Sequence, residues 1–111
     1  MGGGVGISMQ APIRIATEKS VFAMPEATIG FFCDVGGSYF LPRILQNPAY
    51  GLYLGLSSER FKGKELLSYG VATHYIESEA LDALRADLSK NVSSKTSRED
   101  ILKIVEKHCS T

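Results

Sequence analysis

Residues 22–40 form the most apolar part of this sequence, and proline and glycine divide that part into short elements. Pro25 lacks a backbone N–H donor, so it is expected to end a strand predicted over residues 20–24. The chain around Gly30 is expected to form a loop, and a helix is expected to open at Asp34. The pattern therefore predicts an α/β chain with short strands.

Hydrophobic periodicity predicts further strands and helices on both sides of this segment. The strands are predicted over residues 13–17 and 71–76, and the helices over residues 3–10, 48–54, 64–69, 79–90 and 97–105. Pro42 is expected to interrupt the helix that follows residue 34, because proline removes a helical hydrogen bond. Short strands are thus followed mostly by helices, in at most one domain.

Two carboxylates, Glu26 and Asp34, lie in the apolar segment, and no Lys or Arg stands between residues 22 and 40 to pair with them. Carboxylates are rarely buried without a partner. Two interpretations are open. Either Glu26 is an exposed loop residue and Asp34 caps a helix, or the two acids form a general acid–base pair in an apolar cleft.

The charge and cysteine content exclude several classes of partner. The 111 residues carry 12 basic and 12 acidic side chains, a formal net charge of +0, and no basic block. This balance argues against nucleic acid or an anionic membrane as a partner. No apolar run approaches ~18 residues, so no membrane span is expected. Cys33 and Cys109 lack CxxC spacing, so neither a metal site nor a disulfide framework is indicated.

The sequence opens on the run MGGGVG, which is expected where a strand delivers the chain into a tight turn before a helix. Nothing precedes this run, so residue 1 looks like a cut point inside a larger protein. The first N–H groups of the following helix have no partner within the helix and point the same way. An anion or oxyanion site could form there.

Three stretches together resemble the crotonase (enoyl-CoA hydratase/isomerase) superfamily, and within it the 3-hydroxyisobutyryl-CoA hydrolases. They are GGGVGISM, RIATEKSVFAMPEATIGFFCDVGGSYFLPRIL and RFKGKELLSYGVATHYIES, and they cover residues 1–80 almost continuously. The resemblance implies an α/β fold: a partial crotonase-like ββα spiral core followed by helices, without the N-terminal half. Residues 1–78 would form the C-terminal part of that core, and residues 79–111 a helical extension.

The resemblance also implies a thioester hydrolase of valine breakdown, acting on 3-hydroxyisobutyryl-CoA or a similar short hydroxyacyl-CoA in mitochondria. CoA is part of the substrate, and no other cofactor is implied. Glu26 matches the family's catalytic glutamate, and Asp34 the hydrolase's second acid. Gly3 would donate its backbone N–H to the oxyanion hole, with Gly4 beside it as a substrate-binding residue. Gly6 lies where the superfamily's hydratases carry another catalytic glutamate, which favours the hydrolase branch.

Other polar or reactive residues are expected to be structural. Cys33 stands where the family usually has proline, and it is expected to be a small buried residue rather than a nucleophile. His74 is expected to be a packed strand residue rather than a base. Arg14, Lys19 and Arg43 are expected on solvated faces rather than on CoA phosphates.

Three functions stay open at this point. The first is the hydrolase, and the second is hydration or isomerisation of an enoyl-CoA, which the glycine at position 6 disfavours. The third is a non-catalytic truncated remnant that binds a full-length homologue or nothing. The family's other oxyanion donor would lie upstream of residue 1, so this segment alone is expected to be weak or inactive. Its exposed core surface would allow self-association.

Overall fold

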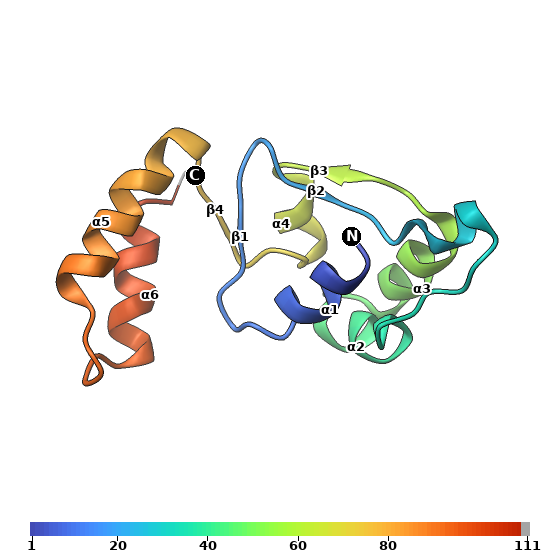
Figure 1. The fold of residues 1–111 in the computed structure, drawn as a ribbon, viewed down its shortest axis with the longest axis horizontal. Coiled ribbons are helices and arrows are strands. Elements are labelled where there is room, and N and C mark those ends of the chain that lie inside the picture. Colours follow the sequence, from blue (N-terminus) through green and yellow to red (C-terminus); the bar gives the residue numbers. More distant parts are fainter. Residues whose placement is uncertain (110–111) are drawn as a thin grey trace.

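A computed structural model describes residues 1–109 as a mixed chain of helices and two-residue strands. The elements in chain order are α1 (Gly3–Ser8), β1 (Ile15–Ala16), β2 (Val21–Phe22), the 3₁₀ helix η1 (Pro25–Ile29), α2 (Gly37–Ile44), α3 (Pro48–Ser57), β3 (Phe61–Lys62), α4 (Glu65–Tyr69), β4 (His74–Tyr75), the 3₁₀ helix η2 (Ser78–Ala80), α5 (Leu81–Asn91) and α6 (Arg98–Lys107). The molecule is elongated, 46 × 27 × 22 Å, with α5 and α6 at one end and η1 at the other (Figure 1).

Two strand pairs join segments that are distant in sequence. β1 pairs with β4 in parallel, with Ala16 opposite Tyr75. β2 pairs with β3 in antiparallel orientation, with Phe22 opposite Phe61. The three strands predicted from alternation are present in shorter form, whereas β3 was not predicted because a two-residue strand carries no readable alternation.

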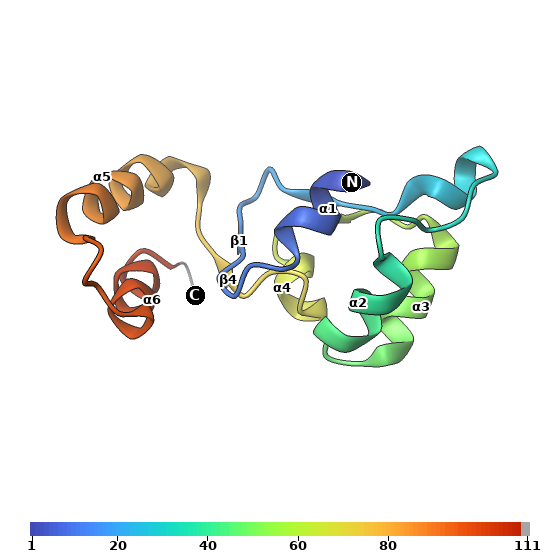
Figure 2. The same ribbon diagram turned by 60° about the horizontal axis from the view of Figure 1, so that its bottom comes forward.

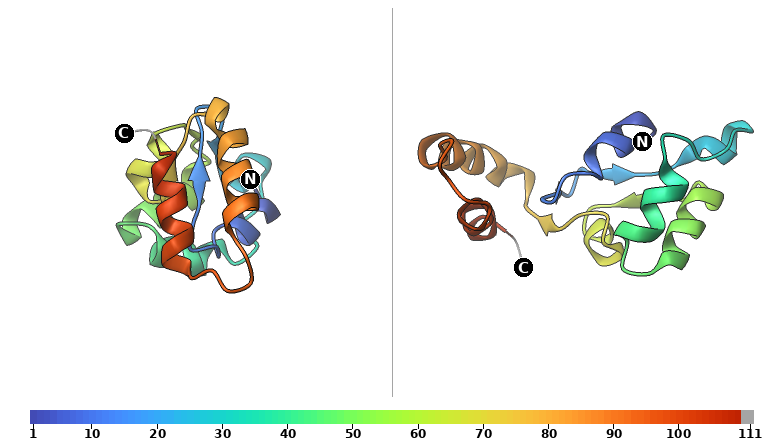
Figure 3. Two further views of the ribbon diagram at one scale, coloured as in Figure 1. Left: turned by 90° about the vertical axis from the view of Figure 1, so that its left-hand side faces the viewer. Right: turned by 90° about the horizontal axis from the view of Figure 1, so that it is seen from below.

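The apolar core has two parts. The larger part lies among α1 to α4 and the strands, whose arrangement Figure 2 shows. Met24, Leu41 and Leu54 are fully buried there. The smaller part centres on Ile76 and two helical residues, Leu84 of α5 and Val105 of α6. Figure 3 shows α5 and α6 side by side at one end of the molecule. The division of the chain at residue 78 stays a prediction.

Capping residues mark several helix ends. The Asn47 side chain accepts a hydrogen bond from the backbone N–H of Ala49 at 2.9 Å, at the start of α3. Gly70 ends α4 with a φ of 83°, which glycine adopts without steric cost. The Ser97 hydroxyl accepts a hydrogen bond from the backbone N–H of Asp100 at 3.3 Å, at the start of the helix predicted from residue 97.

The prediction that Pro42 interrupts its helix is wrong. Proline lies inside α2, which continues to Ile44. Gly51 of α3 approaches it so closely that a Cβ on Gly51 would lie 2.6 Å from the Pro42 nitrogen. The close packing of the two helices therefore overrides the local helix-breaking tendency of proline.

The expectation that a helix opens at Asp34 is also wrong, because α2 begins three residues later, at Gly37. The Asp34 carbonyl accepts a hydrogen bond from the Gly37 N–H at 2.9 Å, which closes a turn over the intervening residues. Val35 and Gly36 have φ angles of 51° and 80°. Two successive positive φ angles are typical of a type I′ turn.

Two acidic side chains make hydrogen bonds at the end of the molecule formed by α5 and α6. Glu18 joins the β1–β2 turn to η2, and Asp87 joins α5 to the C-terminal end of α6. Glu18, in the β1–β2 turn, accepts hydrogen bonds from the hydroxyl and the N–H of Ser78, and these bonds lower its pKa to about 2. Asp87 of α5 lies 2.9 Å from His108 Nε2 and 3.0 Å from Lys107 Nζ. Its hydrogen bond to His108, then that to Lys107, lowers the pKa of Asp87 to about 2.

Among the described residues, no helix combines the length and the apolar character needed to cross a membrane.

Candidate active site

Glu26 is a buried carboxylate without a hydrogen-bond partner. It follows Pro25 in the first turn of η1, and only 6% of its surface is exposed. Within residues 1–109, neither of its two carboxylate oxygens meets a hydrogen-bonding group. The interpretation of Glu26 as an exposed loop residue is therefore wrong. A buried, unpartnered carboxylate is costly to fold, so it marks a candidate functional group.

Asp34 lies in the turn that precedes α2 and is half-buried. It does not cap that helix: the N-cap position belongs to Gly36, and no side chain makes a capping bond there. The capping interpretation of Asp34 is therefore wrong as well. Its main-chain carbonyl closes the turn, and its carboxylate makes no capping bond to α2.

The Cys33 thiol connects the two acids. Burial raises its pKa, and the negative charges of Glu26 and Asp34 raise it further, so both carboxylates lie near one sulfur atom. The thiol fills the space of an absent side chain: a Cβ on Gly37 would be 2.7 Å from Sγ. A half-buried thiol with a raised pKa is a poor nucleophile at neutral pH, which agrees with the structural role predicted for Cys33.

Gly3 and Gly4 begin α1 and are exposed. Gly2 precedes them with a φ of 54° and turns the chain into the helix. A Cβ on Gly3 or Gly4 would meet no heavy atom within 4 Å, so the space beside both residues is open. Their roles as oxyanion donor and substrate-binding residue, like the catalytic roles of the two acids, stay predictions.

Gly6 brings α1 into contact with the turn that carries Asp34. A Cβ on Gly6 would lie 3.2 Å from the Cβ of Val35 and 3.3 Å from its carbonyl oxygen. Val35 has a φ of 51°, and a β-branched residue rarely adopts this left-handed conformation, at a cost of about 1–3 kcal/mol. Any side chain at position 6 would therefore crowd Val35.

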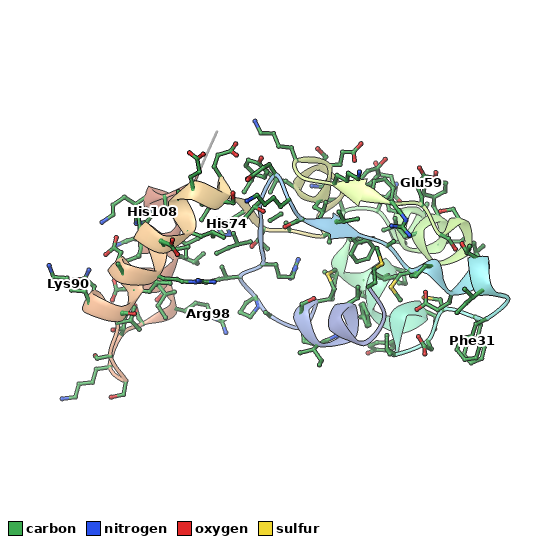
Figure 4. All side chains as sticks on the ribbon, turned by 45° about the horizontal axis from the view of Figure 1, so that its top comes forward. Phe31, Glu59, His74, Lys90, Arg98 and His108 are labelled. Atoms are coloured by element: carbon green, nitrogen blue, oxygen red, sulfur yellow. The ribbon has the colours of Figure 1, made fainter. Side chains whose placement is uncertain are left out.

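An apolar cavity of about 520 Å³ opens beside Cys33, between η1, α2 and α3. Its lining includes Phe31, Phe32, Cys33, Leu41, Leu52 and Leu56. The rings of Phe31 and Phe32 stack with centroids 4.4 Å apart, and Figure 4 places Phe31 at the end of the molecule. The cavity has room for an apolar group beside the Cys33 thiol.

The Arg14 side chain makes hydrogen bonds to main-chain carbonyls. Arg14 is not on a solvated face: its guanidinium donates to the carbonyls of Val71 and Ala11, both at 2.8 Å, and to that of Gly70 at 3.2 Å. Burial lowers its pKa. These bonds fix the chain before β1 against the segment before β4. Sequence reasoning missed this role, because a single arginine looks the same at a surface and among carbonyls.

Lys19 and Arg43 are exposed, as predicted. Arg43 donates to the Tyr39 carbonyl at 2.5 Å and lies over the Tyr39 ring. His74 is half-buried in β4, with Nδ1 2.8 Å from the Thr73 hydroxyl, and Figure 4 shows it far from Phe31 and near the α5–α6 end. It is a packed strand residue, as predicted. Within residues 1–109, no group of three or more His, Cys, Asp and Glu side chains is arranged to hold a metal ion.

Comparison with known proteins identifies the relatives of this chain. The family model described as enoyl-CoA hydratase/isomerase matches residues 1–111. A mitochondrial 3-hydroxyisobutyryl-CoA hydrolase of Dictyostelium discoideum is 48% identical over 113 residues, covering 100% of this chain and 29% of the relative. The human protein of the same name is 46% identical over 108 residues, 97% of this chain and 27% of the relative.

A third relative has a different name. The small ribosomal subunit protein mS47 of Neurospora crassa is 56% identical over 90 residues, 81% of this chain and 17% of that protein. The chain thus spans less than a third of the length of each of these curated relatives.

Solved structures share the fold. A carnitinyl-CoA dehydratase from Mycobacterium thermoresistibile superposes with a TM-score of 0.79 at 30% identity, covering 100% of this chain and 30% of that one. An enoyl-CoA hydratase from Rhodobacter sphaeroides gives a TM-score of 0.70 at 30% identity, covering 96% and 32%. The predicted crotonase-like fold class is confirmed.

Proposed function

Because this chain belongs to the enoyl-CoA hydratase/isomerase family, we propose that it carries the catalytic acids of an acyl-CoA thioester hydrolase. The substrate would be 3-hydroxyisobutyryl-CoA or a similar short hydroxyacyl-CoA, as in the names of its hydrolase relatives. The observation that carries the proposal is Glu26, which is buried, has two unpartnered oxygens and lies near the same thiol as Asp34.

Thioester hydrolysis requires a base or nucleophile at the carbonyl carbon and donors for the charge that develops on the carbonyl oxygen. Glu26 can accept a proton from water as that water attacks, with the CoA sulfur leaving as the thiolate. Alternatively, its carboxylate attacks the carbonyl carbon, and water then opens the mixed anhydride. Both routes use the same buried oxygens. The apolar surroundings would exclude other water and strengthen electrostatic interactions in the site.

The remaining roles follow from the chemistry of each group. The backbone N–H of Gly3 would donate to the developing oxyanion, a contribution of about 3–4 kcal/mol for one donor. Gly4, beside it, would line the substrate path. Asp34 would orient the substrate hydroxyl or assist proton transfer, and CoA enters as part of the substrate with no further cofactor. The names of the hydrolase relatives support a mitochondrial location, and a place in valine breakdown is proposed from the family resemblance.

The test is release of free CoA from 3-hydroxyisobutyryl-CoA by a polypeptide that contains this segment. Glu26→Gln keeps the shape of the side chain but removes its charge, and we expect at least a ~10²-fold loss in kcat. Glu59→Gln is the matched control, because Glu59 is an exposed glutamate near β3 (Figure 4). Normal turnover by Glu26→Gln, or hydration of an enoyl-CoA in place of hydrolysis, would refute the proposal.

A second candidate function is favoured by the 56% identity to small ribosomal subunit protein mS47. In that case the segment would serve as part of a ribosomal component. Sedimentation distinguishes the two functions. A ribosomal component co-sediments with the small subunit, and Glu26→Gln leaves that co-sedimentation unchanged. A hydrolase releases CoA and stays at the top of the gradient.

A further inference from the structure

Val35 occupies a turn position at which its residue type is disfavoured. Residues 34–37 form a turn closed by the bond from the Gly37 N–H to the Asp34 carbonyl, and both central residues have positive φ angles. Glycine, asparagine and aspartate dominate such positions, because a β-branched side chain crowds the backbone there. A residue kept in an unfavourable conformation indicates that its side chain has a role in the surrounding structure.

The contact made by Val35 points to that role. Its Cβ and Cγ2 atoms would lie 3.2 and 3.3 Å from a Cβ on Gly6, so the valine side chain packs directly on the bare backbone of α1. α1 is the helix whose first residues are Gly3 and Gly4. The residue before Val35 is Asp34. One contact thus joins the helix with the candidate oxyanion donors to the turn with the second acid.

We propose that Val35 is a positioning residue, whose packing on Gly6 fixes the turn that carries Asp34 against α1. The contact sets the distance between the Asp34 carboxylate, the Cys33 thiol and the backbone at the start of α1. Its purpose in catalysis rests on the function proposed above, whereas the contact and its effect on Asp34 do not.

The reactivity of the Cys33 thiol can be used to follow the position of the Asp34 carboxylate, and this measurement requires no enzymatic activity. Burial and then the charges of Glu26 and Asp34 raise the pKa of this thiol, so the pH profile of its alkylation by a neutral reagent, iodoacetamide, is expected to depend on both carboxylates. The chain is studied with Cys109→Ser, which leaves one thiol. Asp34→Asn is expected to shift the midpoint of the profile to lower pH, because a negative charge is removed.

Val35→Gly is the decisive variant. Glycine adopts a positive φ freely, so the turn is still favoured while the contact with Gly6 is lost. We expect a midpoint shift in the same direction as for Asp34→Asn, and no further shift when the two changes are combined. The matched control is Ser58→Gly, at the other non-glycine residue within residues 1–109 that has a positive φ, 58°, at the end of α3. It is expected to leave the midpoint unchanged.

Two comparisons separate positioning from a general loss of structure. Glu26→Gln should shift the midpoint by the same amount whether position 35 holds valine or glycine, because Glu26 is held by η1. The proposal is overturned if Val35→Gly leaves the midpoint at its original pH, or if its shift persists in full beside Asp34→Asn, which would indicate only exposure of the thiol. It is also overturned if Val35→Gly abolishes the effect of Glu26→Gln. Failure of CoA release alone would overturn the hydrolase and leave this result standing.

Discussion

The Cys33 sulfur lies where the side chain of residue 37 would be, because a Cβ on Gly37 would stand 2.7 Å from Sγ. Met24 Cε would be 3.3 Å from the same Cβ position, so Gly37 packs against the side chains of both Cys33 and Met24. The packed thiol lines the apolar cavity, and its pKa is raised by burial and by the charges of Glu26 and Asp34. The absence of one side chain therefore shapes the candidate site.

The first expected outcome concerns this packing. Gly37→Ala places a methyl group too close to Sγ, and we expect the free energy of unfolding to fall by about 1–3 kcal/mol, as for other overpacked positions. Urea denaturation measures the change. Gly55→Ala is the matched control, because a Cβ there would be 3.7 Å from the Cys33 side chain, an ordinary contact. Adding Cys33→Ala to Gly37→Ala should recover part of the loss. Simple additivity of the two changes would show that the thiol is not the obstacle.

The sequence predicted the elements whose causes are local. Asn47 and Gly70 mark helix ends through hydrogen bonds and φ angles within a few residues of themselves. The start of α2 was misplaced because the Asp34 turn holds a valine where turn rules call for glycine or asparagine. Val35 packs on Gly6, which lies 29 positions away in the sequence, so no local pattern could predict the contact.

The candidate site, like the fold, could be predicted only in part from the sequence. Two acids in an apolar segment raised the question of a shared function, and the family resemblance assigned them roles. Neither the sequence pattern nor the resemblance could indicate that both carboxylate oxygens of Glu26 are unpartnered, because that depends on every element packed around η1. The contacts of Arg14 with the carbonyls of Gly70 and Val71 were missed for the same reason, since they join residues 56 or more positions apart.

The second expected outcome concerns acid stability. The lowered pKa values of Glu18 and Asp87, both about 2 against ordinary values of 4.5 and 3.8, mean that the folded state favours the charged forms. Their contribution to stability is therefore complete above about pH 4.5 and is lost as the pH falls towards about 2. Glu18→Gln and Asp87→Asn should each flatten the fall of the urea midpoint between pH 5 and pH 2. Glu59→Gln is the exposed control, and an unchanged acid limb in both variants would contradict these hydrogen bonds.

The third expected outcome concerns self-association. Phe32, Leu52 and Leu56 line the apolar cavity, and each is at least 65% exposed. Exposed clusters of this kind favour contact with other apolar surfaces. We expect the 111-residue chain to bind a hydrophobic dye and to sediment faster as its concentration rises. Phe32→Ser with Leu56→Ser should reduce both effects, whereas the control Ile7→Ser, on α1, should reduce them less. A monomeric chain that binds no dye at any concentration would count against this surface.

The last expected outcome concerns the division of labour between the acids. Asp34→Asn should reduce kcat less than Glu26→Gln, because Asp34 is proposed to position the substrate hydroxyl rather than to activate water. The loss should be larger for 3-hydroxyisobutyryl-CoA than for isobutyryl-CoA, which lacks the hydroxyl, since only the first substrate offers Asp34 a partner. Release of CoA from the two substrates, measured side by side in a polypeptide that contains this segment, gives the comparison.

Cys33→Ser is the control for these measurements, because a protonated thiol with a packing role should tolerate a hydroxyl of similar shape. We expect nearly unchanged turnover on both substrates. Equal losses for Asp34→Asn on the two substrates would remove the hydroxyl-positioning role. Loss of activity in Cys33→Ser together with full activity in Glu26→Gln would assign the reaction to a thiol nucleophile instead. In that case the raised pKa of Cys33 would have to fall when the substrate binds, because only the thiolate attacks a thioester.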